Sequence, residues 1–152
     1  MSYNKIGQGG EGLPETKNKE KTVLVCVTPQ RSCTRLIKQG EKIALKSRSK
    51  MIVLAVFAKR DGSSPEISSV LEELYEAARM CDATMSIYFN DAPDILAAVF
   101  ASKKNAGTIV TGFPRERSSG FVNRLHGLLP ETPIIMIDEN SREHKILPES
   151  FT

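Results

Sequence analysis

The chain has 152 residues, 40% of them hydrophobic, and a formal net charge of +3 at pH 7. This length suits one domain with a hydrophobic core, and so small a positive excess does not predict nucleic-acid binding. No apolar run approaches the roughly 20 residues that span a bilayer, so no membrane segment is predicted. Three cysteines without a CxxC pair, and no apolar signal core near the start, are typical of a reducing setting, so a cytoplasmic location is expected.

The two ends of the chain differ from its middle in composition. Residues 1–20 are rich in glycine, lysine and glutamate and predict a disordered N-terminal tail, because such a segment cannot bury enough apolar surface to order itself. Residues 21–138 predict one α/β domain, and residues 139–152 predict a second, C-terminal tail.

Five short apolar runs, rich in β-branched residues, predict buried strands. They are Thr22–Thr28, Met51–Ala58, Thr84–Phe89, Gly107–Phe113 and Pro133–Asp138.

Helical patterns fill the segments between these runs. In the first helix, Cys33–Ser47, apolar positions recur at three- and four-residue spacing, and Ser32 is the expected N-cap. Arg35 falls on the opposite, polar face together with three lysines. The second helix is expected to be capped by Ser64 and to begin at Pro65.

The third and fourth helices are shorter. Residues 92–105 predict a helix whose inward face carries Ile95, Leu96, Val99 and Phe100. Residues 121–129 predict a helix that Pro130 stops.

Strands joined by single helices predict right-handed crossovers and a parallel sheet covered on both faces. In such a sheet, ligands bind beyond the carboxyl ends of the strands, where the strand order reverses. The loop between the fourth strand and the fourth helix lies at this edge and holds Arg115, Arg117, Ser118 and Ser119 after Gly112. Hydroxyls, arginines and amides at a helix start are what a phosphate needs, although a solvated turn has a similar composition.

No catalytic motif accompanies this loop. The sequence has no HExxH, GxSxG or P-loop signature, and His126 and His144 are expected to be packing or surface residues. We therefore predict a non-enzymatic protein without a bound metal or a required cofactor.

The segments "VLVCVTPQRSCTRLIKQGEKIALKSRSKMIVLAVF", "GTIVTGFPRERSSGFVNRL" and "PIIMI" resemble the universal stress protein family. The stretch "TPQRSCTRLI" is most similar to the branch that forms a cytoplasmic module of Kdp-type potassium-sensing histidine kinases. This resemblance covers roughly residues 21–138. It implies a five-stranded, parallel, doubly wound sheet of order 3-2-1-4-5, with a switch point between the first and fourth strands. It also implies a non-catalytic stress-signalling or osmosensing module that binds a small adenine nucleotide (ATP, AMP or cyclic di-AMP) and a protein partner.

Two nucleotide-binding patterns of the family are matched in part. ATP-binding members carry an aspartate after the first strand, where this chain has Thr28, and a motif G-x2-G-x9-G-[ST] after the fourth. Gly112 matches the first glycine, Arg115 stands at the second, and the final Gly-[ST] has no match.

The second pattern belongs to members that bind cyclic di-AMP through Ser-x-Ser, twenty residues, then Phe-Thr-Ala-x-Tyr. Ser32 and Ala55 match this pattern, Phe57 keeps an aromatic ring, and Gln30 stands where a serine is expected. The resemblance thus assigns nucleotide contacts to Thr28, Gln30, Ser32, Ala55, Phe57, Gly112, Arg115, Arg117, Ser118 and Ser119.

The resemblance also implies partners. Family members commonly pair through the last strand, and "PIIMI" would be an exposed apolar edge in a monomer, so a homodimer through this strand is expected. A sensor kinase or a potassium transporter component is the expected protein partner. The alternative is an interaction or adaptor module of the same fold that has lost nucleotide binding.

Overall fold

Strands and helices alternate along the chain, as the sequence predicts. This computed structural model describes residues 20–28, 30–62, 64–113 and 120–148. Residues 1–19 of the predicted tail at 1–20 therefore lie outside the described residues. The strands are β1 (Thr22–Val27), β2 (Lys50–Phe57), β3 (Thr84–Phe89), β4 (Ala106–Gly112), β5 (Ile134–Ile137) and β6 (Glu143–Ile146). The helices are α1 (Thr34–Ser47), α2 (Pro65–Met80), α3 (Pro93–Lys103) and α4 (Phe121–Leu128), with 3-10 turns η2 (Arg31–Cys33) and η3 (Lys59–Asp61).

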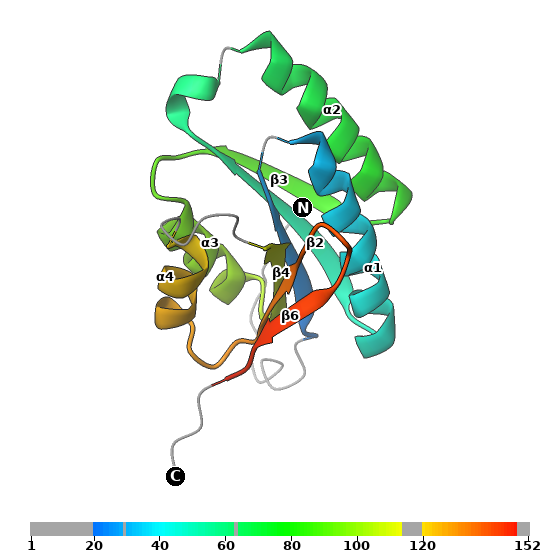
Figure 1. Ribbon diagram of the computed structural model, residues 1–152, viewed down its shortest axis with the longest axis vertical. Helices are drawn as coiled ribbons and strands as arrows, with labels where there is room; N and C mark the ends of the chain where they lie inside the picture. The colour runs from blue at the N-terminus through cyan, green and yellow to red at the C-terminus, as the bar shows by residue number, and fades with distance from the viewer. Residues whose placement is uncertain (1–19, 29, 63, 114–119, 149–152) are drawn as a thin grey trace, which may run out of the picture.

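The strands form one sheet of order β3-β2-β1-β4-β5-β6, shown in Figure 1. β1 to β5 run parallel in the predicted order 3-2-1-4-5, which is confirmed. The predicted count of five strands is wrong, because β6 adds a sixth strand antiparallel to β5. Part of the segment expected as a C-terminal tail, residues 143–146, is thus a strand of the sheet.

A tight turn after β5 brings β6 back along the sheet. Oδ1 of Asp138 accepts hydrogen bonds from the main-chain N–H of Asn140 (2.8 Å) and Arg142 (2.9 Å), and the Asp138 carbonyl accepts one from Ser141 (3.0 Å). Aspartate side chains that bond to the backbone two residues on are a common way to start a turn. β5 therefore has a neighbour on each side, and the apolar edge on which the predicted dimer depended is covered within the chain.

The alternation of side chains along the strands divides the core into two layers. In β1, Val23, Val25 and Val27 pack under α1 and α2, whereas Leu24 and Cys26 face α3 and α4. All six residues of β1 are buried because helices cover both faces of the sheet. The two layers hold β1 and β4 in the middle of the sheet, where the strand order reverses.

The start of α2 agrees with the sequence, and the start of α1 does not. Pro65 stands in the first turn of α2 and Ser64 at its N-cap position, but the Ser64 hydroxyl makes no capping hydrogen bond and donates to Oε1 of Glu66 at 3.2 Å. α1 begins at Thr34 after Cys33, because residues 31–33 form a separate 3-10 turn that contains the predicted cap, Ser32.

The sequence predicts that the apolar side chains of α3 point inward, but not all of them do. Its most buried residues are Ala97, Ala98, Phe100 and Ala101, whereas Ile95 and Val99 are 56% and 47% exposed. The segment "DILAAVFA" is apolar around most of the helix, so its periodicity does not single out one face. In the part of the chain that the structure describes, no helix is both long and apolar enough to cross a membrane.

Candidate functional site

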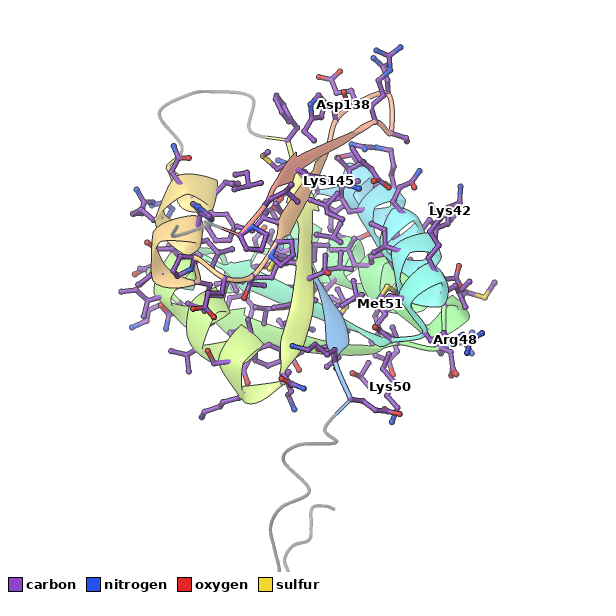
Figure 2. The ribbon with its side chains drawn as sticks, turned by 90° about the horizontal axis from the view of Figure 1, so that it is seen from below. Lys42, Arg48, Lys50, Met51, Asp138 and Lys145 are labelled. Atoms are coloured by element: carbon purple, nitrogen blue, oxygen red, sulfur yellow. The ribbon has the colours of Figure 1, made fainter. Side chains whose placement is uncertain are left out.

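A pocket of about 970 Å³ opens at the carboxyl ends of β1, β4 and β5. It thus lies at the switch point between the first and fourth strands, where the resemblance implies a ligand site. In Figure 2, Asp138 of this pocket lies at the opposite end of the sheet from Lys50, the first residue of β2. The lining residues are Cys26, Thr28, Gln30, Ser32, Cys33, Arg35, Leu36, Thr111, Gly112, Phe113, Ile137, Asp138, Glu139 and Asn140.

Four of the predicted contact residues come together in this pocket: Thr28, Gln30, Ser32 and Gly112. The first three belong to the turn that leads from β1 into α1. This turn is held by its own backbone, since the Gln30 N–H donates to the Thr28 carbonyl at 2.7 Å. All three are exposed, so their polar groups are available to a ligand. Gly112 faces them from the end of β4.

Ala55 and Phe57, which the cyclic di-AMP pattern also assigns to the site, lie in the core. They are 0% and 1% exposed, and both belong to the layer under α1 and α2. Both residues lie on the same face of β2 as Val53, because side chains alternate along a strand. Neither residue lines the pocket.

The remaining predicted contacts are Arg115, Arg117, Ser118 and Ser119, which lie outside the described residues. The described chain leaves the end of β4 at Phe113 and resumes at Gly120, the N-cap of α4, which has a left-handed backbone with φ of 67°. Phe113, the last described residue before them, lines the pocket.

Sequence reasoning missed one wall of the pocket, formed by Arg35 of α1 and by the turn between β5 and β6. Arg35 was assigned to the solvent face of its helix, yet its Nη1 donates to the Asp138 carbonyl at 2.5 Å. The signal that could have found this wall is the aspartate that ends the last predicted strand, followed by Glu-Asn-Ser, because this pattern favours a turn.

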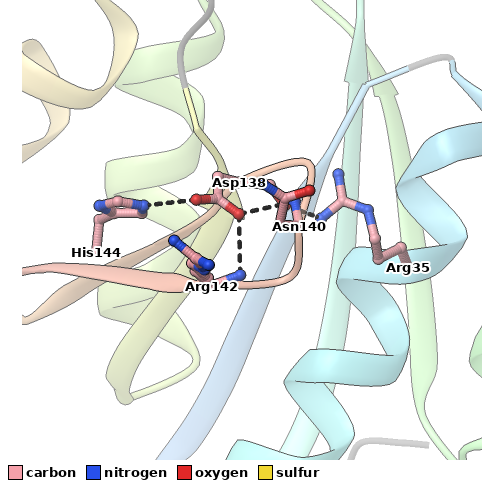
Figure 3. A network of polar contacts seen from close by, with 5 residues as sticks. All are labelled: Arg35, Asp138, Asn140, Arg142 and His144. Carbon is pink, nitrogen blue, oxygen red and sulfur yellow. Dashed lines mark hydrogen bonds and ion pairs between the residues drawn. The ribbon is translucent and has the colours of Figure 1, made fainter.

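His144 of β6 joins this wall to the end of β4. Its Nε2 lies 2.8 Å from Oδ2 of Asp138, and its ring packs against the ring of Phe113 with centroids 4.5 Å apart. The hydrogen bond from His144, together with the N–H groups of Arg142 and Asn140, lowers the pKa of Asp138 from 3.8 to about 2. Figure 3 shows the four contacts that converge on Asp138.

The lowered pKa of Asp138 predicts a pH window for this turn. A carboxylate with a depressed pKa stabilises the folded state above its ordinary pKa, and this contribution is lost as the pH falls from about 4 towards 2. An NMR titration of the Asp138 carboxyl group should give a midpoint near 2 in the wild type. In His144→Ala the midpoint should move up towards 3.8. A wild-type midpoint near 4 would show that the His144 contact does not form in solution.

Two cysteines also line the pocket. Burial raises the pKa of the Cys26 thiol to about 12, so this cysteine stays protonated and is a poor nucleophile. The Cys33 thiol lies 3.6 Å from the Thr28 hydroxyl, which gives each a weak polar partner. No group of three His, Cys, Asp or Glu side chains in the described segments is placed to hold a metal ion.

Comparison with solved structures places this fold among known ones. The universal stress protein from Archaeoglobus fulgidus matches with a TM-score of 0.59 and 15% identity, over 78% of this chain and 94% of that one. A universal stress protein solved in complex with cAMP matches with a TM-score of 0.54 and 18% identity, over 72% and 90%. The 4-carboxy-2-hydroxymuconate hydratase from Pseudomonas putida KT2440 matches with a TM-score of 0.57 and 10% identity, over 76% and 65%.

The sequence itself matches no protein-family model, and no curated protein matches it significantly. At identities of 10–18% the structural matches establish the fold and leave the chemistry to this chain's own residues. The two universal stress proteins are spanned almost entirely, whereas about two thirds of the hydratase is covered. The chain therefore has the doubly wound α/β fold that universal stress proteins also have.

Proposed function

We propose that this chain is a non-catalytic signalling protein of the universal stress protein type, which binds a small adenine nucleotide in the pocket between β1 and β4. One observation carries the proposal: the pocket lies at the switch point and gathers Thr28, Gln30 and Ser32 opposite the end of β4. Its volume of about 970 Å³ lies at the upper end of the usual range for small-molecule sites, about 300–1,000 Å³. The cAMP complex of a structural neighbour supports the choice of an adenine nucleotide.

The partner follows from the resemblance to the Kdp-type branch. We propose a cytoplasmic sensor kinase or potassium transporter component as the protein that responds to the nucleotide. The stretch "TPQRSCTRLI" supports this, since Thr28, Gln30 and Ser32 of this stretch line the pocket and α1 begins at its Thr34. A ligand in the pocket would thus touch the start of a helix that also presents an exposed surface.

A thermal-shift and calorimetric series with ATP, AMP, cAMP and cyclic di-AMP tests the proposal. A ligand that binds only the folded state raises the melting temperature. At a concentration a hundred times its Kd, it adds about 2.7 kcal/mol to the free energy of unfolding. GTP serves as a matched control for the base. If none of the adenine nucleotides raises the melting temperature at millimolar concentration, the proposed function is refuted.

Arg115→Ala tests the loop after β4. We propose that Arg115 contacts the ligand phosphates, because it stands where the family's loop carries its second glycine. A charge-assisted hydrogen bond is worth roughly 1.5–3 kcal/mol, so the loss should weaken nucleotide binding about tenfold or more in a calorimetric titration. The control is Lys42→Ala, which removes the same charge from the outer side of α1, where Lys42 points away from the sheet (Figure 2). If Arg115→Ala and Lys42→Ala bind the nucleotide equally tightly, Arg115 makes no contact with the phosphates and the loop is only a turn.

A second candidate function is an interaction module of the same fold without a nucleotide. The observation that favours it is an exposed apolar area on the edge strand β3 and the neighbouring α3, because such areas mark protein–protein contacts. On the α3 side of the sheet it consists of Tyr88, Ile95 and Val99, whereas Ile87 and Phe89 are exposed on the opposite face of β3. Self-association also belongs to this candidate, and light scattering in the micromolar range measures it. This function gains support if the nucleotide series is negative while a dimer or a captured kinase is observed.

A further inference from the structure

Arg35 differs from the other basic residues in its surroundings. In residues 20–28, 30–62, 64–113 and 120–148, every lysine and every other arginine is exposed, whereas Arg35 is partly buried. It is also the basic side chain among those lining the pocket at the switch point. A cation withdrawn from water loses solvation, and this cost must be offset by a partner.

The guanidinium of Arg35 is held in one orientation. Its Nη1 donates to the carbonyl oxygen of Asp138, which lies across the pocket rim on the turn between β5 and β6. The turn itself is fixed by the Asp138 carboxylate, which binds two main-chain N–H groups and the ring of His144. Arg35 therefore lines the pocket from α1 and is bonded to the turn between β5 and β6.

The positive charge of Arg35 has no carboxylate beside it within the described part of the chain. Three other arginines have one: Arg31 pairs with Glu73, Arg79 with Glu76 and Arg124 with Asp94. Asp138 offers Arg35 a neutral carbonyl, and no described carboxylate oxygen lies within 4.0 Å of its guanidinium. One of the five N–H donors of the guanidinium is used by this carbonyl, which leaves a fork suited to an anion.

We propose that Arg35 is an anion-binding residue in the described wall of this pocket and that it binds a phosphate group of the ligand. This role rests on the proposed function, because it names the part of the nucleotide that the described pocket recognises. Because Arg35 also donates a hydrogen bond to the Asp138 carbonyl, the same side chain would contact both the bound phosphate and the turn between β5 and β6. Binding is thus expected to protect the N–H groups of Asn140 and Arg142 from hydrogen exchange.

The test compares AMP with adenosine, which differ by the phosphate alone. Calorimetric titrations of the wild type should show tighter binding of AMP. In Arg35→Ala the affinity for AMP should fall about tenfold or more, while that for adenosine should change by less than about twofold. Lys42→Ala, which removes a charge from the same helix, should leave both affinities unchanged. Arg35→Lys keeps the positive charge but lacks the forked guanidinium, so its affinity for AMP should lie between those of the wild type and Arg35→Ala.

Each other outcome bears on a different claim. If Arg35→Ala lowers the affinities for AMP and adenosine equally, or changes neither affinity, Arg35 only supports the turn and the inference is overturned. If the wild type binds neither compound and ATP, cAMP and cyclic di-AMP also fail to bind, the proposed function fails, and pyrophosphate becomes the probe. Binding of pyrophosphate by the wild type and not by Arg35→Ala would keep the anion role, whereas equal binding, or none by the wild type, would overturn it. Arg35→Lys supplies the comparison if Arg35→Ala does not fold.

Discussion

Replacing Phe57 with alanine is expected to lower the free energy of unfolding by about 3–5 kcal/mol. The ring of Phe57 is 1% exposed and packs edge-to-face on Phe89, with centroids 5.6 Å apart. It is among the largest fully buried side chains of the described protein and belongs to the core layer under α1 and α2, so its removal leaves a cavity in a densely packed layer. Chemical denaturation monitored by circular dichroism gives the measurement. Nucleotide affinity of the folded variant should stay unchanged, because Phe57 does not line the pocket.

Phe113→Ala is the matched aromatic control. Phe113 is 45% exposed, lines the pocket and packs against His144. Its loss should cost about 1 kcal/mol of stability and should weaken nucleotide binding. The opposite result, in which Phe57→Ala weakens binding and leaves stability unchanged, would restore Phe57 to the ligand site that the family pattern assigns to it.

Gly40→Ala is expected to destabilise the protein although it adds a better helix former. An alanine Cβ at this position of α1 would overlap Cγ2 of Val25 and would lie 3.1 Å from Sδ of Met51. Val25 is 0% exposed and belongs to a strand paired on both sides, so it cannot move aside. Overpacking of a dense core costs about 1–3 kcal/mol, whereas replacing glycine in a helix gains at most about 1 kcal/mol. We expect a net loss of about 1–2 kcal/mol in the free energy of unfolding.

Gly127→Ala separates the two effects, because Gly127 lies in α4 and nothing is within 4 Å of a Cβ there. This variant should be about 0.5–1 kcal/mol more stable than the wild type. A similar gain in Gly40→Ala would mean that α1 can shift away from β1. Such a shift would also move Arg35, which α1 holds at the pocket, so the AMP affinity of the two glycine variants provides a second comparison.

Much of the fold is determined by local sequence patterns. β1 is apolar at nearly every position, which a strand tolerates only when helices cover both faces of a parallel sheet. Pro65 marks the start of α2, because proline fits the first turn of a helix and disrupts its interior. The alternation of such elements predicts a parallel sheet covered on both faces. The order of its five parallel strands, the place of the switch point and the pocket residues Thr28, Gln30, Ser32 and Gly112 are what the family resemblance implies.

Other features depend on contacts between distant residues. β6 has the sequence "EHKI", which carries no strand pattern, and it forms because Asp138 organises a turn and β5 offers an edge. The apolar faces of α3 are equivalent in sequence, so its packing partners decide that Ile95 and Val99 remain outside.

The pocket shows the same division. By periodicity Arg35 belongs to the polar face of α1, yet a carbonyl 103 residues away draws it into the pocket wall. Ala55 and Phe57 match a binding pattern in spacing, but both lie on the face of β2 that packs into the core, because side chains alternate along the strand. Sequence spacing determines which residues share one face of an element, whereas the neighbours of that face are decided only when the elements pack together.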